Sequence, residues 1–173
     1  MDHVDGILEQ WQRERPGLDT SPMAVIGRLA RATAHVEAQL AANYARHGID
    51  AATFDVLATL VRQGAPHELS PARLAADAMI TTSAVAQRLN RLEAQGYLTR
   101  HPDPADGRAK LVRLTREGRE VVDRVLPDHL ATEAALLDRL SVEQQKTLAA
   151  LLAALTPEMR SPENSVRGMA DTA

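Results

Sequence analysis

The sequence contains no cysteine and almost no aromatic residues. Its 173 residues include one Trp, one Phe and two Tyr. Without cysteine the chain can form neither a disulfide framework nor a thiol redox switch, which excludes peroxide sensing through a Cys sulfur and favours a reducing cytoplasm. Because the strands of a β-sandwich favour aromatic and β-branched residues, the shortage of aromatics in a chain rich in Ala and Leu predicts helices packed on helices.

The chain also lacks a strong net charge and a long apolar run. A formal net charge of -3 argues against a protein that coats nucleic acid regardless of sequence, although local basic patches are compatible with it. No apolar run approaches the roughly 18 residues of a membrane span, and the first residues are acidic and polar, unlike a signal peptide. We therefore expect one soluble, cytoplasmic domain over residues 1–173 with no membrane partner.

Catalytic motifs are missing as well. The sequence has no Cys nucleophile, no Gly-rich phosphate loop and no motif that combines Ser, His and an acid. Its six histidines are scattered, without the close pair that is typical of metal sites. We therefore expect the protein to be no enzyme and to need neither a cofactor nor a metal ion.

What the sequence does contain is a succession of amphipathic helices with one strand-turn-strand pattern. Apolar residues at helical spacing indicate helices over 2–15, 21–48, 50–63, 70–78, 81–96, 115–140 and 141–155. The residues predicted to cap helix N-termini are Ser21, Asp50, Ser70, Thr115 and Ser141. Strands are predicted at 97–101 and 110–114 around a polar tip, and the tail from 156 to 173 is predicted to be disordered. The fold is thus mainly α with a small β-hairpin wing.

Two short helices followed at once by a β-hairpin are the elements of a winged helix-turn-helix, whose second helix lies in the DNA major groove. In that second helix Val85, Leu89 and Leu92 share one face, which we expect to pack. The opposite face is polar, has no acidic residue over its first two turns, and carries side-chain types that hydrogen-bond to base edges. The residues expected to contact DNA there are Thr82, Ser83, Gln87, Asn90 and Arg91.

The hairpin adds positive charge to a chain that is acidic overall. Arg108 and Lys110 are expected to reach phosphates or the minor groove from the wing, and Asp106 is expected to pair with Arg108. Further cations on the hairpin are Arg100, His101 and Arg113. Because some winged helices serve protein contacts, an interaction module is the alternative to DNA binding. Acidic or apolar residues on the reading face would favour that alternative.

The run from Leu92 to Leu98 (LEAQGYL), then Arg100, then the run from Asp103 to Arg108 (DPADGR), resembles the signature of the MarR family of transcription regulators. The resemblance covers about residues 21 to 155. It implies a homodimer built from helices in 1–47 and 115–155, a winged helix-turn-helix over 51–114, and binding to a palindromic operator in double-stranded DNA.

The predicted first helix, which carries Trp11, is similar to the extra helix of the MarR branch that responds to urate and related small anions. That resemblance implies a ligand site formed by Trp11, Asp55 and Arg88, with Gln87 in the place of an Asn usual in that branch. The ligand is therefore open between urate and a carboxylate.

Helical geometry gives independent support for the role of Arg88. This residue lies on the flank of the packed face and is expected to point toward the protein, where it can meet an acid from another helix. If that acid is Asp55, an anion that competes for the guanidinium would break the pair, displace the recognition helix and release the operator. The alternatives are that Trp11 is only a core or dimer contact and that Asp55 and Arg88 form only a structural ion pair.

Overall fold

The computed structural model describes residues 1–78, 82–107 and 109–155, and for residues 82–84 only the backbone. The elements in chain order are α1 (His3–Glu14), α2 (Ser21–Arg46), α3 (Ala51–Arg62), β1 (Glu68–Leu69), α4 (Pro71–Asp77), α5 (Thr82–Ala94), β2 (Leu98–Pro102), β3 (Lys110–Leu114), α6 (Arg116–Leu136) and α7 (Val142–Leu155). The predicted fold class, mainly α with a small β wing, is confirmed. The predicted break at Met79 and Ile80 and the predicted tail over 156–173 lie outside the described residues.

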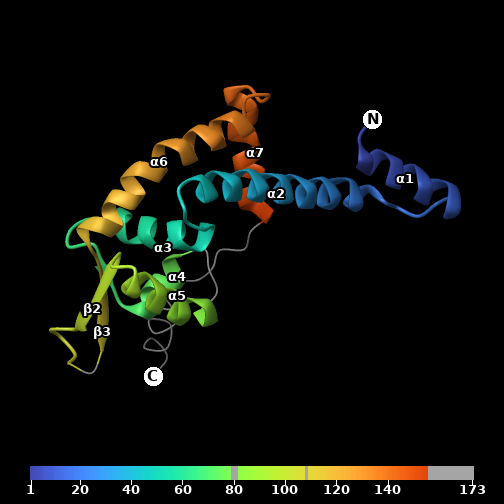
Figure 1. Ribbon diagram of the computed structural model, residues 1–173. Helices are drawn as coiled ribbons and strands as arrows, with labels where there is room; N and C mark the ends of the chain where they lie inside the picture. Colours follow the sequence, from blue (N-terminus) through green and yellow to red (C-terminus); the bar gives the residue numbers. More distant parts are fainter. Residues whose placement is uncertain (79–81, 108, 156–173) are drawn as a thin grey trace, which may run out of the picture.

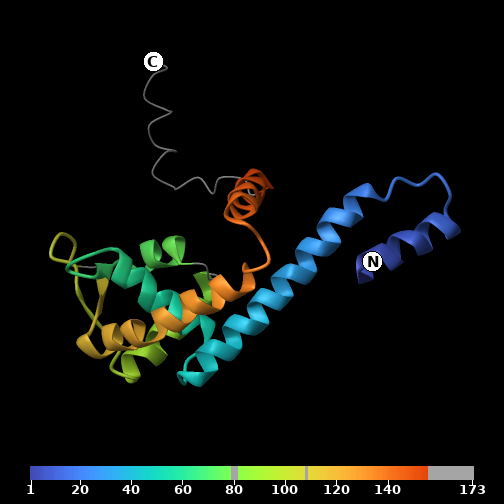
Figure 2. The ribbon, with the colours of Figure 1, turned by 90° about the horizontal axis from the view of Figure 1, so that it is seen from above.

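The long helices and the winged part occupy different regions of the molecule. Figure 1 shows α2 and α6 above, with α3, α4, α5 and the β2–β3 hairpin gathered below them. Seen from above, α1 folds back beside the N-terminal part of α2, at the end away from the hairpin (Figure 2). None of the helices in the described ranges carries an apolar stretch long enough to cross a bilayer.

The core lies under the helix-turn-helix. Leu57 and Leu60 of α3, Leu74 of α4 and Leu92 of α5 are fully buried, and Leu89 is 1% exposed. Three further residues that close this core belong to the sheet and to α6: Leu98, Val112 and Val125. Each fully buried Leu stabilises the fold by roughly 1.5–3 kcal/mol relative to an exposed one. The three helices and the hairpin therefore pack around one shared core.

Side-chain caps set most helix starts. The side chains of Asp50, Ser70 and Thr115 accept the N–H groups of Thr53, Arg73 and Gly118, as predicted, and Ser141 accepts that of Gln144. The prediction that Ser21 is an N-cap is wrong, because Ser21 is already the first helical residue of α2 and Thr20 precedes it as the cap. The N–H of Ser21 is instead accepted by the Asp19 carboxylate at 2.9 Å. An acid two residues earlier thus supplies the acceptor.

The sheet has one strand more than the predicted hairpin. Strand β1 pairs antiparallel with β3, and β3 pairs with β2, which gives the order β1-β3-β2. The register places Glu68 opposite Arg113 and Leu98 opposite Leu114. Because β1 has two residues, it is too short to show the alternation by which strands are predicted from sequence.

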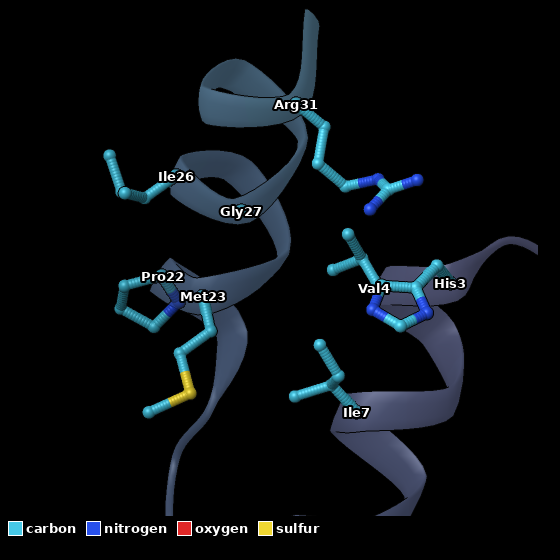
Figure 3. Close-up of a pocket in the computed structure, with 8 residues that line it drawn as sticks. All are labelled: His3, Val4, Ile7, Pro22, Met23, Ile26, Gly27 and Arg31. Atoms are coloured by element: carbon cyan, nitrogen blue, oxygen red, sulfur yellow. The ribbon is translucent and has the colours of Figure 1, made fainter. Parts of the chain in front are cut away.

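The helices outside the winged part leave many large apolar side chains exposed. On α1 and α2 these include Ile7, Trp11, Met23, Val25, Ile26 and Val36, and on α6 and α7 they include Leu126, Leu130, Val142, Leu148, Leu151, Leu152 and Leu155. Between α1 and α2 such side chains line an open groove of about 550 Å³. Figure 3 shows Val4 and Ile7 of α1 on one side of this groove and Met23 and Ile26 of α2 on the other.

Candidate nucleic-acid interface

Helix α5 packs with one face and exposes the other, as its sequence predicts. Val85, Leu89 and Leu92 are buried, whereas Gln87, Asn90 and Arg91 are exposed. Since α5 begins at Thr82, the predicted contacts Thr82 and Ser83 fall in its first turn, but their side chains lie outside the description. The exposed face therefore presents an amide, a second amide and a guanidinium, which are groups that can hydrogen-bond to base edges in the major groove.

One flank of α5 is held by an ion pair with Asp50. The Arg88 Nη1 atom lies 2.5 Å from Asp50 Oδ2, and Arg91 Nη1 lies 3.9 Å from the same oxygen. Asp50 is the N-cap of α3 and also accepts the N–H of Thr53 at 2.8 Å. Burial alone raises the pKa of Asp50, but the hydrogen bonds from Thr53 and Arg88 outweigh it and hold the pKa below its usual value. The carboxylate is therefore charged at neutral pH and fixes α5 to the start of α3.

The prediction that Arg88 pairs with Asp55 is wrong about the acid. Arg88 does point toward the protein and meets the acid at the start of α3, but that acid is Asp50. Asp55 lies half-buried on the same helix. Burial, with the charges of Glu133 and Asp55, raises the pKa of the Tyr44 hydroxyl to about 12.

The other flank of α5 is held by Arg100 of β2. Its Nη1 atom donates to Asn90 Oδ1 at 2.8 Å and lies 3.3 Å from Glu93 Oε2. This contact was not predictable from the sequence, in which Arg100 is only one of the hairpin cations, because no spacing rule relates a helix position to a strand residue ten positions later. The recognition helix is thus braced on both sides, by Asp50 on one and by Arg100 on the other.

The wing carries less free positive charge than its sequence indicates. Glu68 of β1 lies 3.0 Å from His101 Nε2 and 2.6 Å from Arg113 Nη2, so one carboxylate engages two of the predicted hairpin cations. Lys110, the first residue of β3, is exposed. Arg108 lies outside the described residues, and so does its predicted pairing with Asp106. The structure therefore leaves Lys110 as the described wing cation that is available to a phosphate.

Within one chain, Trp11 is not brought together with the other two residues predicted to bind a ligand, Asp55 and Arg88. Trp11 lies on α1, at the end of the molecule away from α5, while Asp55 lies on α3 and Arg88 on α5 (Figure 1). The Trp11 side chain is 40% exposed and lies beside the turn that joins α1 to α2. Among the described residues, His, Asp and Glu side chains form no group of three that could hold a metal ion.

Known proteins with similar sequences are transcription regulators, and the part that matches a family model is the helix-turn-helix with its wing. A model of the MarR family matches residues 47–109, from the end of α2 to the wing. The HTH-type transcriptional regulator PecS of Dickeya dadantii is 40% identical over 149 residues, which cover 86% of this chain and 90% of PecS.

Solved structures with the same architecture include two regulators with more than a quarter of their aligned residues identical. Sco3205 of Streptomyces coelicolor, a MarR family regulator solved in complex with DNA, superposes with a TM-score of 0.75 at 28% identity over 86% of this chain and 94% of its own. BpsR of Bordetella bronchiseptica, whose DNA binding is regulated by 6-hydroxynicotinic acid, gives a TM-score of 0.69 at 27% identity over 76% and 91%. The winged helix-turn-helix and the identity with PecS together show that this chain belongs to the MarR family of DNA-binding transcription regulators.

Proposed function

We propose that the protein is a homodimeric repressor that binds a palindromic operator and is released from it by a small anion, either urate-like or a carboxylate. The observation that carries the release mechanism is the ion pair between Arg88 of the recognition helix and Asp50 at the start of α3. The guanidinium is 21% exposed, so an anion from solvent can reach it. An anion that replaces Asp50 as the partner of Arg88 would free α5 from one of its two braces.

The experiment that tests this function is a gel-shift titration of the purified protein on its own upstream DNA. Urate, citrate and aconitate are added in turn to the preformed complex. Release by one of them supports the ligand-gated repressor. Specific binding that none of them disturbs keeps the DNA-binding function and contradicts the proposed ligand class. The regulation of BpsR by 6-hydroxynicotinic acid supports testing small ring compounds with an acidic group.

Two kinds of DNA contact are expected to respond differently to mutation. Phosphate contacts release counterions, so Arg108→Ala or Lys110→Ala should weaken binding to all sequences alike and reduce the salt slope by about one each. By contrast, Arg91→Ala should cost about 1–3 kcal/mol, mainly at one base pair. The control is Arg13→Ala, which removes a cation from α1, away from α5. Fluorescence anisotropy at several salt concentrations measures both effects, and a slope that does not change in either wing variant contradicts the wing contact.

The proposed dimer would be built from the apolar surfaces of α1, α2, α6 and α7. The number of large apolar side chains exposed on these helices supports this, since soluble monomers seldom expose extensive apolar patches. Ile26 and Leu151 are 57% and 60% exposed. We expect sedimentation equilibrium to give twice the mass of one chain, and Ile26→Arg or Leu151→Arg to shift the protein toward monomer. Glu120→Arg, at an exposed polar position of α6, should leave the dimer intact; a monomeric parent protein contradicts the proposal.

A further inference from the structure

Asp50 serves the two guanidiniums on the flank of α5 unequally. Its Oδ2 atom accepts a hydrogen bond from Arg88 Nη1 at 2.5 Å, whereas Arg91 Nη1 lies 3.9 Å away, beyond hydrogen-bond distance. The Oδ1 atom accepts the N–H of Thr53 at 2.8 Å, so the carboxylate is tethered at the start of α3 by its own helix cap. Moving toward Arg91 would cost Asp50 this cap. Arg91 is therefore attracted by the carboxylate without being hydrogen-bonded to it.

A carboxylate from solvent has no such tether. It can centre itself between Arg88 and Arg91 and give one oxygen to each, and charge-assisted hydrogen bonds of this kind are roughly twice as strong as neutral ones. Both guanidiniums can be reached from solvent, because they are 21% and 64% exposed. Asp50, which is 47% exposed, stays hydrated and keeps the Thr53 N–H when the guanidiniums leave it. The exchange therefore leaves α3 capped.

Arg91 differs from Arg88 in lying on the face of α5 that is proposed to read DNA. It is exposed there with Gln87 and Asn90, where a guanidinium is expected to hydrogen-bond to a base edge. The start of α3, where the anion would bind, lies on the flank of that face. A side chain drawn to the flank is drawn away from the groove. The anion and the DNA therefore both use Arg91, from different directions.

We propose that Arg91 is a second binding residue of the effector site, the site of the anion that releases the operator. The effector binds through a carboxylate held jointly by Arg88 and Arg91, and release acts in part by drawing Arg91 away from DNA. This inference rests on the proposed function and deepens it, because it adds a residue to the site and selects the carboxylate from the two classes of anion. By linkage, losing Arg91 should lower both the affinity for the effector and its coupling to DNA.

Isothermal titration calorimetry of the full-length protein with citrate, in the absence of DNA, tests the site. Ionic strength is kept constant, since salt screens exposed ion pairs. Arg91→Ala should bind citrate about fivefold more weakly than the parent protein, which is the upper range for an exposed pair. Arg91→Lys keeps the positive charge and should lose less affinity. The matched control is Lys110→Ala, which removes an exposed cation of the wing and should leave the affinity for citrate unchanged.

Anisotropy titrations on the upstream DNA, without citrate and with saturating citrate, measure the coupling as the ratio of the two dissociation constants. We expect this ratio to fall at least about threefold in Arg91→Ala. Equal citrate affinity in Arg91→Ala and the parent, an equal loss in Lys110→Ala, or an unchanged ratio overturns the inference. Release of the operator by urate, with no binding of citrate or aconitate, also overturns it but keeps the proposed function. If none of the three anions releases the parent protein from DNA, the proposed release mechanism itself fails.

Discussion

Gly118→Ala is expected to destabilise the protein by about 3 kcal/mol, at the upper end of the cost of overpacking a well-packed site. A Cβ atom at this position would lie 2.1 Å from the backbone oxygen of Tyr97 and 2.8 Å from Leu114 Cδ1. Both neighbouring atoms are held in place by other contacts. The Tyr97 oxygen accepts the N–H of Thr115 at 3.1 Å, and Leu114 lies in the core, 9% exposed. The methyl group would therefore push the first turn of α6 away from the start of the wing.

The matched control for this variant is Gly6→Ala. Gly6 lies within α1, and a Cβ atom there meets nothing within 4 Å. Ala at such a position should stabilise the protein by about 0.5–1 kcal/mol, because Ala loses less backbone freedom on folding than Gly does. Urea unfolding followed by circular dichroism measures both variants. Equal midpoints for Gly118→Ala and the parent would show that α6 approaches the wing less closely than the structure indicates.

The fold was predictable where local chemistry decides it. Asp50 and Thr115 precede apolar-periodic segments and cap the helices that follow, and strand β3 runs from Lys110 to Leu114 as its alternation predicts. Strand β1 was not predictable, because its two residues pair with a strand more than forty positions later. Such pairing depends on the path of the chain through space, which local periodicity does not encode.

The partner of Arg88 was not predictable for a related reason. Asp50 and Asp55 both lie near the start of α3, and the choice between them depends on how α3 and α5 cross. The position of α1 depends on similarly distant contacts. Arg28 Nε binds Asp2 at 2.8 Å, Arg28 also pairs with Asp5, and Val4 packs 3.4 Å from the Cβ position of Gly27. The amphipathic pattern predicts that α1 is a helix, but these contacts decide that it lies along α2 and carries Trp11 away from Arg88 of its own chain.

Arg88→Ala is expected to weaken operator binding, because it removes one of the two braces of α5, and to make the remaining complex insensitive to anions. The proposed switch needs a guanidinium at this position, since the anion and the Asp50 carboxylate compete for it. Anisotropy titrations of the protein on its upstream DNA, with urate, citrate or aconitate added, measure the ligand concentration at half release. If the anion that releases the parent protein releases Arg88→Ala at the same concentration, Arg88 is not its binding group.

Two conservative variants identify the competing acid. Asp50→Asn keeps an oxygen that accepts the Thr53 N–H, because Asn caps helices about as well as Asp. It removes the negative charge that competes with the anion for Arg88. Because Asp50 is 47% exposed and solvent screens the pair, the gain in anion affinity should be about fivefold, which corresponds to about 1 kcal/mol. Asp55→Asn, which removes a charge from the same helix, should leave half release unchanged. If only Asp55→Asn changes the ligand concentration at half release, the competing acid is Asp55.

The pH at which these titrations are run follows from the pKa of Asp50, which is held below its usual value. A carboxylate of this kind contributes stability above its unfolded-state pKa and loses that contribution as the pH falls through the lowered pKa of the folded state. At pH 7 the pair with Arg88 is therefore fully charged, and a difference between Asp50→Asn and the parent reports on the ion pair. In strong acid Asp50 is protonated in the parent, so the two proteins should converge in stability. Equal stabilities of Asp50→Asn and the parent at pH 7 would show that Asp50 acts through its cap alone, since Asn caps equally well, and the competition proposed for Arg88 would then lack its acid.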